Sequence, residues 1–340
     1  MKADTAESLW FTGPRRVEIR KSVPQRPGQG EVRVSALYSA ISHGTEMLIY
    51  RGEVPHGLSP DLTIPTIEGS FAYPIKYGYA SVGHIVETGP EVKGFAKGDL
   101  VFAFNPHESE YTLPVEFVVK LPRDIDPQRG VFLASTETAI NAMLDAGPLL
   151  GERVAIFGQG TVGLLMTRLA RRAGASLVVT ADLFEKRRAL SLALGADFTI
   201  DPSVEPPAER VRELTAGAGA DVVIEVSGRP ETLDEAIRAT AFQGRVVIVS
   251  WYGNKRAPVP LGDDFHRRRL TIRSSQVSNI DAGLFPRWNV ERRRELAVSY
   301  LIDLRLSEMV THTIAFSDAA AGYRIIDERP EDAVQVVLRF

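Results

Sequence analysis

Short apolar segments alternate with amphipathic segments between residues 153 and 273, and this alternation restricts the possible folds more than any other feature. Buried strands read as short apolar runs, whereas the stretches between them show the 3.6-residue period of helices. Strands separated by helices form a parallel sheet with helices on both faces. We therefore predict an α/β fold with a doubly wound parallel sheet. The strand-like runs are VAIF (154–157), LVV (177–179), DFTI (197–200), DVVIEV (221–226), RVVIVS (245–250) and LTIR (270–273), and the helix-like stretches are 161–172, 185–194, 208–214 and 232–239.

The first third of the chain shows β-structure of another kind. Residues 31–37 (EVRVSAL) alternate apolar and polar side chains, as a strand with one buried face does. Similar runs at 79–87, 100–104 and 116–121 are separated by segments rich in Pro and Gly, which favour turns. This pattern predicts a small, irregular, antiparallel barrel.

The C-terminal part predicts two helices and a strand. Residues 290–302 have helical periodicity, and a second helix opens within 317–323 with Ser317 or Asp318 as its capping residue. Residues 334–340 form the last strand, which we expect to return to the barrel.

A glycine motif, Gly158-Gln159-Gly160-Thr161-Val162-Gly163, lies between the first run of the predicted sheet and the first helix. In this context Gly158 permits a tight turn, Gly160 lets the backbone approach a pyrophosphate, and Gly163 lets the helix pack close to the strand. The helix begins at Thr161 and Val162, and its N-terminus offers unpaired N–H groups and a positive dipole end to phosphate. The motif predicts a dinucleotide-binding site.

Asp182 follows the second run of the sheet and indicates which dinucleotide binds. A carboxylate at this point accepts hydrogen bonds from the adenosine ribose hydroxyls and repels a 2′-phosphate, so we predict NAD rather than NADP. Arg187 lies five residues further on, where it can cover the adenine or the ribose. Arg187 and Arg188 would serve a 2′-phosphate only if Asp182 turned away.

Composition narrows the remaining classes. The chain has no cysteine, which excludes disulfides, thiol catalysis and cysteine-based metal sites. A net charge of -3 does not favour nucleic acid as a partner, so a small-molecule substrate is expected. The first ten residues lack the apolar core of a signal peptide, and no apolar run is long enough to span a bilayer. We expect a cytoplasmic protein with no membrane partner.

Several further segments resemble the medium-chain dehydrogenase/reductase superfamily over nearly the whole chain. They are PGQGEV (27–32), HGTE (43–46), GHIVETG (83–89) with Gly98-Asp99, and the glycine motif. The resemblance implies a GroES-like barrel formed by residues 1–135 and 276–340, interrupted by a Rossmann domain at 136–275. It also implies a homodimer joined through the edge strand at 269–275.

The chain departs from the zinc-dependent members of that family. Their first ligand, a Cys, begins the segment that here reads His43-Gly44-Thr45-Glu46, and their Gly-His-Glu appears here as Gly78-Tyr79-Ala80. Their third ligand falls near Ala134, and their four-cysteine zinc loop has no counterpart. Only His43 can bind a metal among these positions, so we expect no metal.

The resemblance also implies which residues carry out the chemistry. Thr45 matches the family's relay hydroxyl, and His43 and Tyr79 occupy vacated ligand positions where either can act as an acid/base group. Glu46 matches a family carboxylate that can set the tautomer of His43. Thr138 should contact the nicotinamide. Four residues at the carboxyl ends of the fourth and fifth strands should bind the cofactor or line the substrate: Ser227, Ser250, Trp251 and Tyr252.

Residues 41–52 (ISHGTEMLIYRG) are similar to the bacteriochlorophyllide a dehydrogenases and their relatives, which also lack the zinc Cys. This similarity implies a zinc-independent, NAD-dependent alcohol dehydrogenase that transfers hydride between NAD and a secondary alcohol or ketone on a bulky molecule. Two other classes remain open. One is a zinc-free quinone or enone reductase, which usually prefers NADPH and is therefore disfavoured by Asp182. The other is a non-catalytic NAD-binding protein, which side chains filling the cavity around Tyr79 would favour.

Overall fold

The computed structural model describes residues 5–55, 57–58, 70–257 and 259–340, so the first four residues of the N-terminal segment discussed above lie outside it. The chain forms two compact units, one from Met1–Ala134 with Val298–Phe340 and the other from Ser135–Ala297. Residues 276–297 therefore belong to the second unit, whereas the sequence assigned them to the first. The reason is contact with a distant part of the chain, because Arg293 donates to Asn141 Oδ1 at 2.7 Å and also to the carbonyl oxygen of Val277 at 2.5 Å.

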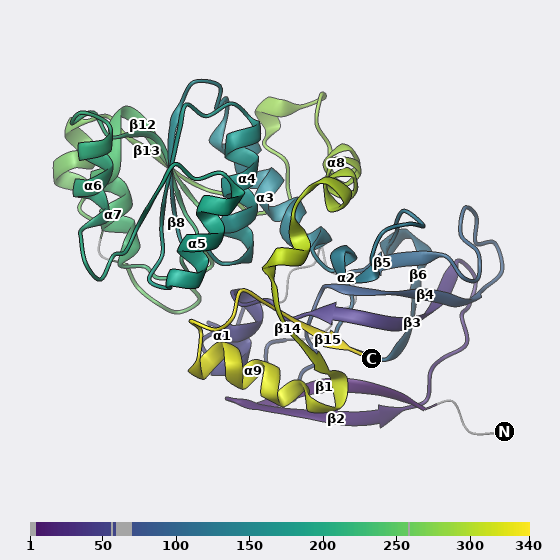
Figure 1. The fold of residues 1–340 in the computed structure, drawn as a ribbon. Helices are drawn as coiled ribbons and strands as arrows, with labels where there is room; N and C mark the ends of the chain where they lie inside the picture. Colours follow the sequence, from purple (N-terminus) through teal and green to yellow (C-terminus); the bar gives the residue numbers. More distant parts are fainter. Residues whose placement is uncertain (1–4, 56, 59–69, 258) are drawn as a thin grey trace. The chain divides into compact units, whose positions relative to one another are not determined.

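The second unit contains a six-stranded, wholly parallel sheet, which confirms the predicted doubly wound fold. The strand order is β10-β9-β8-β11-β12-β13. The chain begins with β8 at the centre and adds β9 and β10 on one side. It then returns to the centre and adds β11, β12 and β13 on the other side, so the order of the strands reverses between β8 and β11. Helices α4 and α5 cover one face of the sheet, and α6 and α7 cover the other (Figure 1). The strands are β8 Arg153–Phe157, β9 Leu177–Ala181, β10 Phe198–Ile200, β11 Ala220–Glu225, β12 Thr240–Ile248 and β13 Thr271–Ser274, and the helices are α3 Leu133–Ala146, α4 Thr161–Arg172, α5 Glu185–Leu194, α6 Pro207–Leu214, α7 Thr232–Ala239 and α8 Val290–Asp303.

The central strands of this sheet are buried on both faces, which explains their nearly continuous apolar sequence. Ala155, Val223 and Val246 are fully buried in one cluster with side chains of the covering helices. Because all six strands run the same way, their carboxyl ends meet at one edge, where open α/β sheets bind ligands. The loops after β8, β9, β11 and β12 therefore form the candidate binding edge.

The first unit is built around a long strand, β3 (Glu31–Ala40), which pairs with three others. The sheet order is β14-β15-β3-β4-β5-β7, and β6 also pairs with β3. All pairs are antiparallel as predicted, except that β14 and β15 are parallel. Parallel neighbours need a crossover connection, and helix α9 supplies it. The other elements of this sheet are β4 Ser81–Thr88, β5 Leu100–Ala103, β6 Glu110–Pro114, β7 Val118–Lys120, β14 Val310–Ala315 and β15 Gln335–Arg339, with α2 Pro127–Gly130 beside it.

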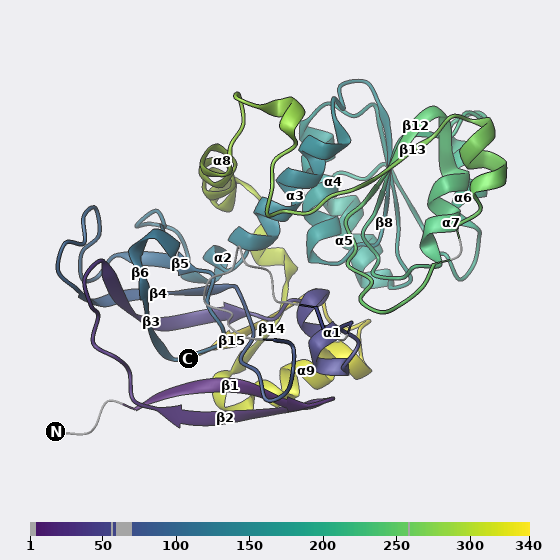
Figure 2. The same ribbon diagram turned by 180° about the vertical axis from the view of Figure 1, so that it is seen from behind.

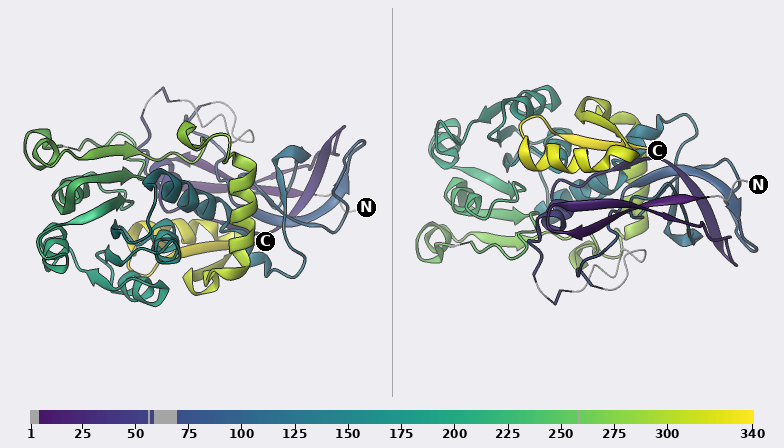
Figure 3. Two further views of the ribbon diagram at one scale, coloured as in Figure 1. Left: turned by 90° about the horizontal axis from the view of Figure 1, so that it is seen from above. Right: turned by 90° about the horizontal axis from the view of Figure 1, so that it is seen from below.

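A second layer of the first unit consists of the hairpin β1–β2 (Ala6–Gly13 and Arg16–Ser22), α1 (Thr45–Arg51) and α9 (Ala319–Glu328). These elements lie side by side in Figure 2, and the view from below in Figure 3 shows the hairpin next to α9. Tyr323 is fully buried between them and stacks on Tyr50. The predicted side-chain cap of α9 is wrong, because a short 3-10 turn, Phe316–Asp318, leads into the helix instead.

In the part of the chain described here, none of the helices has the length and apolar character required to cross a bilayer.

Candidate dinucleotide and active sites

The turn after β8 leaves no room for side chains at two of its glycines. Gly158 has a φ of +103°, and a Cβ added there would lie 2.6 Å from the backbone nitrogen of Ser227. A Cβ on Gly163 would lie 2.0 Å from the carbonyl oxygen of Gly158. The turn therefore packs against the loop after β11 on one side and against the first turn of α4 on the other.

Gly160 is different, because no other atom lies within 4 Å of the position that its Cβ would take. The residue precedes α4, and no side chain caps the helix there. In any α-helix the N–H groups of the first turn have no acceptor further back in the helix, and here that turn includes half-buried Val162. Open space next to the N-terminus of a helix is the arrangement that a pyrophosphate requires.

Asp182 is held in place at the carboxyl end of β9. The residue is only 8% exposed, and its two carboxylate oxygens accept hydrogen bonds from Gln159 N at 2.7 Å and Phe184 N at 2.9 Å. Each carboxylate oxygen has a further lone pair, so the group can still accept bonds from hydroxyl groups. The Gln159 side chain is turned inward, where Thr167 donates to it at 2.9 Å, and does not compete for this position.

Arg187 lies close to Asp182 but is not directed at it for a tight ion pair. Its guanidinium nitrogen is 3.9 Å from the carboxylate, and its Cζ lies 4.8 Å from the centre of the Phe184 ring. Burial lowers the pKa of Arg187, and the charge of Asp182 partly offsets that effect. Arg188 is held by the carbonyl oxygen of Asp182 at 2.9 Å and by Asp201 at 2.9 Å. Asp182 therefore supplies a negative charge at the carboxyl end of β9, and Arg187 lies beside it.

The loops after β11 and β12 are joined by a carboxylate that the sequence analysis did not single out. Glu225 accepts hydrogen bonds from Ser227 N at 2.8 Å, Ser227 Oγ at 2.5 Å and Tyr252 OH at 2.5 Å. Gly228 N donates to Ser250 Oγ at 2.8 Å, which ties the two loops together again. The signal in the sequence was the acidic residue at the fifth position of the run DVVIEV, after three apolar residues.

The remaining residues predicted to bind the cofactor lie as follows. The Tyr252 hydroxyl is bound to Glu225, and burial followed by the negative charge of Glu225 raises the pKa of Tyr252 well above its ordinary value. Trp251 is 37% exposed in the same loop. Thr138 lies half-buried on α3.

In the first unit, Tyr79 and the segment 42–46 come together. The Tyr79 hydroxyl donates to Ser42 Oγ at 2.5 Å, and Thr45 is the first residue of α1. Burial, and then the negative charge of Glu46, raise the pKa of Tyr79 to about 12, although hydrogen bonds with Ser42 and Thr45 act against the rise. The phenol is therefore neutral at physiological pH and serves as a hydrogen-bond donor. His43 lies in the same segment, between β3 and α1.

Glu46 does not set the tautomer of His43 as expected. It is fully buried and accepts hydrogen bonds from Ser42 N at 2.9 Å, His107 Nε2 at 2.9 Å and Tyr323 OH at 2.8 Å, so its imidazole partner in the described structure is His107. The reason is the orientation of the Glu46 side chain, which points from α1 into the core of the first unit. Sequence reasoning missed His107, which lies in a loop with no recognisable pattern.

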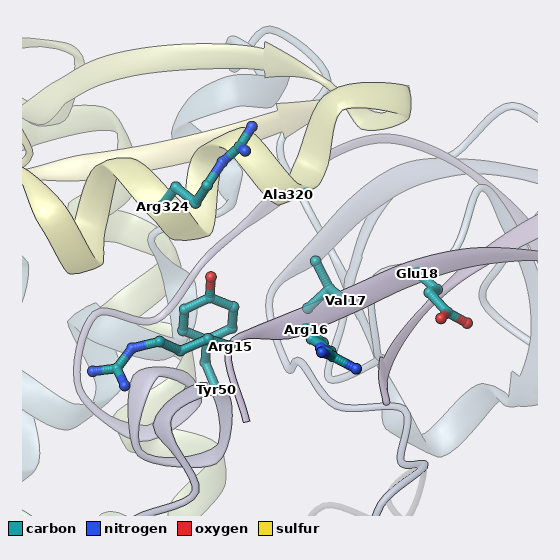
Figure 4. A pocket seen from close by; sticks show the side chains of 7 residues that line it. All are labelled: Arg15, Arg16, Val17, Glu18, Tyr50, Ala320 and Arg324. Carbon is teal, nitrogen blue, oxygen red and sulfur yellow. The ribbon is translucent and has the colours of Figure 1, made fainter. Parts of the chain in front are cut away.

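A separate hollow of about 250 Å³ lies at the turn of the β1–β2 hairpin, beside α1 and α9. Its lining includes three arginines, of which Arg15 is paired with Asp327 at 2.8 Å. Figure 4 shows that the guanidinium groups of Arg16 and Arg324 point in different directions. The positive charge is therefore not gathered at one point.

Comparison with known proteins gives the following matches. Residues 161–289 match the family model of zinc-binding dehydrogenases. The chain is 26% identical over 350 aligned positions to D-guloside 3-dehydrogenase of Escherichia coli (strain K12), covering 98% of this chain and 100% of the relative. It is 30% identical over 267 positions to L-threonine 3-dehydrogenase of Pyrococcus furiosus, covering 70% and 73%. A solved structure of an alcohol dehydrogenase from Escherichia coli CFT073, complexed with NADH, has the same fold, with a TM-score of 0.81 and 20% identity over 99% of each chain.

Proposed function

This chain belongs to the medium-chain dehydrogenase/reductase superfamily and is an enzyme of the dehydrogenase type, and we propose that it is a zinc-independent, NAD-dependent alcohol dehydrogenase. In this proposal it transfers hydride between NAD and a secondary alcohol or the corresponding ketone. The observation that carries the proposal is the fixed carboxylate of Asp182 beside the Gly158–Gly163 turn.

Asp182 supports NAD in preference to NADP for an electrostatic reason. Two backbone N–H groups hold its carboxylate, and the residue is almost completely buried. A ribose 2′-hydroxyl can donate to this carboxylate, whereas a 2′-phosphate would have to lose water against a fixed like charge. Arg187 makes only a long ion pair with the carboxylate, at 3.9 Å, so it offsets part of this charge without a hydrogen bond to it.

Isothermal titration with NAD(H) and NADP(H) tests the cofactor. We expect NAD(H) to bind at least tenfold more tightly, which corresponds to about 1.4 kcal/mol. The change Asp182→Gly should narrow the difference between the two affinities. Asp182→Asn is the matched control, because it removes the charge but keeps the volume and shape of the side chain. Equal affinities of the unmodified protein for the two cofactors would refute the proposal.

Zinc independence rests on the chemistry of the side chains that are present. Residues 161–289 match the family model of zinc-binding dehydrogenases. The segments that supply ligands in the zinc-dependent members of the superfamily lie outside that match, and by the resemblance they contribute here only one imidazole, that of His43. The carboxylate of Glu46 is fully buried and receives three hydrogen bonds. The described residues bring together no three His, Cys, Asp or Glu side chains that fit a zinc ion. The donor set does not fit the metal, so we derive no step through it.

The chain's own residues must then hold the alcohol and remove its proton. When bound, NAD supplies the acceptor for the hydride that leaves the alcohol carbon. We propose that the Tyr79 phenol and the Thr45 hydroxyl orient the substrate oxygen, and that the His43 imidazole takes its proton as the ketone forms. Tyr79 suits the donor role because its raised pKa keeps it neutral.

The relatives and residues 41–52 support the proposed substrate class. Guloside and threonine, the substrates in the names of the two relatives above, each carry a secondary alcohol at the position named. The similarity of residues 41–52 to bacteriochlorophyllide a dehydrogenases supports a bulky substrate. A panel of secondary alcohols of increasing size, followed by NADH absorbance, tests both points. A protein that reduces quinones or enones with NADPH and oxidises no alcohol would belong to the alternative class.

A further inference from the structure

The end of strand β11 carries a buried carboxylate without a counterion. Glu225 has an exposed fraction of 0%. Its partners are a backbone N–H and two hydroxyl groups, all of them neutral donors. In the described residues no lysine, arginine or histidine forms an ion pair with it. Charges buried without an opposite charge are costly, so such a group is unusual and calls for an explanation.

The position of Glu225 in the sheet places it next to the nucleotide turn. It is in register with Phe157 of β8, the residue before Gly158, and with Ile248 of β12. Its hydrogen bonds hold Ser227, and the Ser227 backbone is the surface on which Gly158 packs. The carboxylate therefore supports the turn from the side of β11.

Asp182 supports the same turn from the other side. Strands β8, β9 and β10 form one half of the sheet, and β11, β12 and β13 form the other, with the reversal of strand order between β8 and β11. In this architecture each half binds one mononucleotide of the dinucleotide. Asp182 ends a strand of the adenosine half, so Glu225 belongs to the nicotinamide half.

The two oxidation states of the cofactor differ in charge at one place only. The nicotinamide ring is a cation in NAD⁺ and is neutral in NADH, whereas the adenosine half and the pyrophosphate are unchanged. A fixed negative charge in the nicotinamide half, surrounded by apolar strands that screen it poorly, stabilises the cationic ring more than the neutral one.

We propose that Glu225 is a positioning and specificity-determining residue that strengthens binding of NAD⁺ relative to NADH. This inference rests on the proposed function as an NAD-dependent enzyme. Tyr252 and Ser227 fix the orientation of the carboxylate, and Glu225 in turn fixes the loops that they belong to. The charge would favour release of NADH after oxidation of the alcohol.

The test compares the Kd values of NAD⁺ and NADH, measured by isothermal titration without substrate. The change Glu225→Gln keeps the size of the side chain and removes its charge. We expect it to raise the ratio Kd(NAD⁺)/Kd(NADH) at least threefold. The matched control in the adenosine half, Asp182→Asn, should change both Kd values by the same factor. An unchanged ratio in Glu225→Gln would overturn the proposal.

A second variant keeps the test decisive if Glu225→Gln does not fold, as thermal unfolding would reveal. Glu225→Asp retains the charge and shortens the side chain, so both Kd values should rise while their ratio stays within about twofold of the parent. A ratio that changes as strongly in Glu225→Asp as predicted for Glu225→Gln would contradict a role of the charge. If the parent protein binds neither NAD⁺ nor NADH, the proposed function itself fails, and this outcome is distinct from an unchanged ratio.

Discussion

In the proposed mechanism, single side chains of the first unit determine how a proton leaves the substrate. Tyr79 is held by Ser42 and has a pKa of about 12, so it gains or loses no proton between pH 6 and 9. Replacing it with Phe should therefore leave the pH dependence of the reaction unchanged in that range.

We expect Tyr79→Phe to lower kcat by about 10² or more without changing the shape of the pH profile between pH 6 and 9, because it removes a donor that does not titrate there. His43→Ala should lower kcat by a similar factor, because it removes the group that takes the proton in the proposed mechanism. Both are measured with an alcohol that the parent oxidises. NAD affinity should be unchanged in both variants. A pH profile altered by Tyr79→Phe would contradict the role of Tyr79 as a neutral donor, and an unchanged kcat in His43→Ala would contradict the role of His43 as proton acceptor.

The hydrogen bonds of Glu46 lead to a prediction about metal content. This carboxylate is bound to His107 and Tyr323 in the core, and a single imidazole at His43 is too few ligands for a stable zinc site. Elemental analysis of purified protein after mild dialysis should find far less than one zinc per chain. Stoichiometric zinc that survives a chelator would contradict the assignment of His43 and Tyr79 to the ligand positions.

At the level of elements, single substitutions of Gly163 and Gly160 test the packing of α4 against the turn that precedes it. Gly163→Ala would place a Cβ 2.0 Å from the carbonyl oxygen of Gly158, so the helix must move away from the turn. Overpacking of this kind costs about 1–3 kcal/mol, and we expect a loss of that size in the free energy of unfolding, measured with urea. NAD affinity should fall as well, because the turn is displaced.

Gly160→Ala is the control from the same turn. Its φ is −71°, and no other atom lies within 4 Å of the added Cβ, so stability should stay within about 0.5 kcal/mol of the parent. The methyl group would nevertheless occupy the space that the pyrophosphate needs, and we expect at least a tenfold loss of NAD affinity. A Gly163→Ala protein as stable as the parent would contradict the close packing of α4 on the turn. A Gly160→Ala protein that binds NAD normally would contradict binding of the pyrophosphate next to Gly160.

The elements differ in how far the sequence reveals them. The apolar runs and the glycine motif predicted the parallel sheet and the tight turn after β8, because strands, helices and tight turns are encoded by neighbouring residues. The partners of Glu46 could not be predicted in the same way. His107 and Tyr323 lie 61 and 277 residues away from it along the chain, and only the packing of α1 against α9 and a loop brings them together.

At the scale of the whole molecule, contacts that no local pattern encodes also set the boundary of the second unit. Residues 276–297 join it because Arg293 and Asn141 are hydrogen-bonded across 152 positions of sequence. The edge of the parallel sheet is a second feature of the whole molecule, because it can bind another copy of the chain. Strand β13 pairs with β12 on one side, and within the described residues no strand covers its other side.

An uncovered edge strand presents unpaired N–H and C=O groups, and a second copy of the chain can satisfy them around a twofold axis. We therefore expect light scattering during size-exclusion chromatography to give twice the chain mass of 37.3 kDa. Thr271 and Ser274 are exposed on this strand. The double change Thr271→Lys with Ser274→Lys places like charges opposite each other across the axis, so it should produce monomers that still bind NAD. A parent that is monomeric at every concentration, or a double variant that remains dimeric, would exclude β13 as the interface.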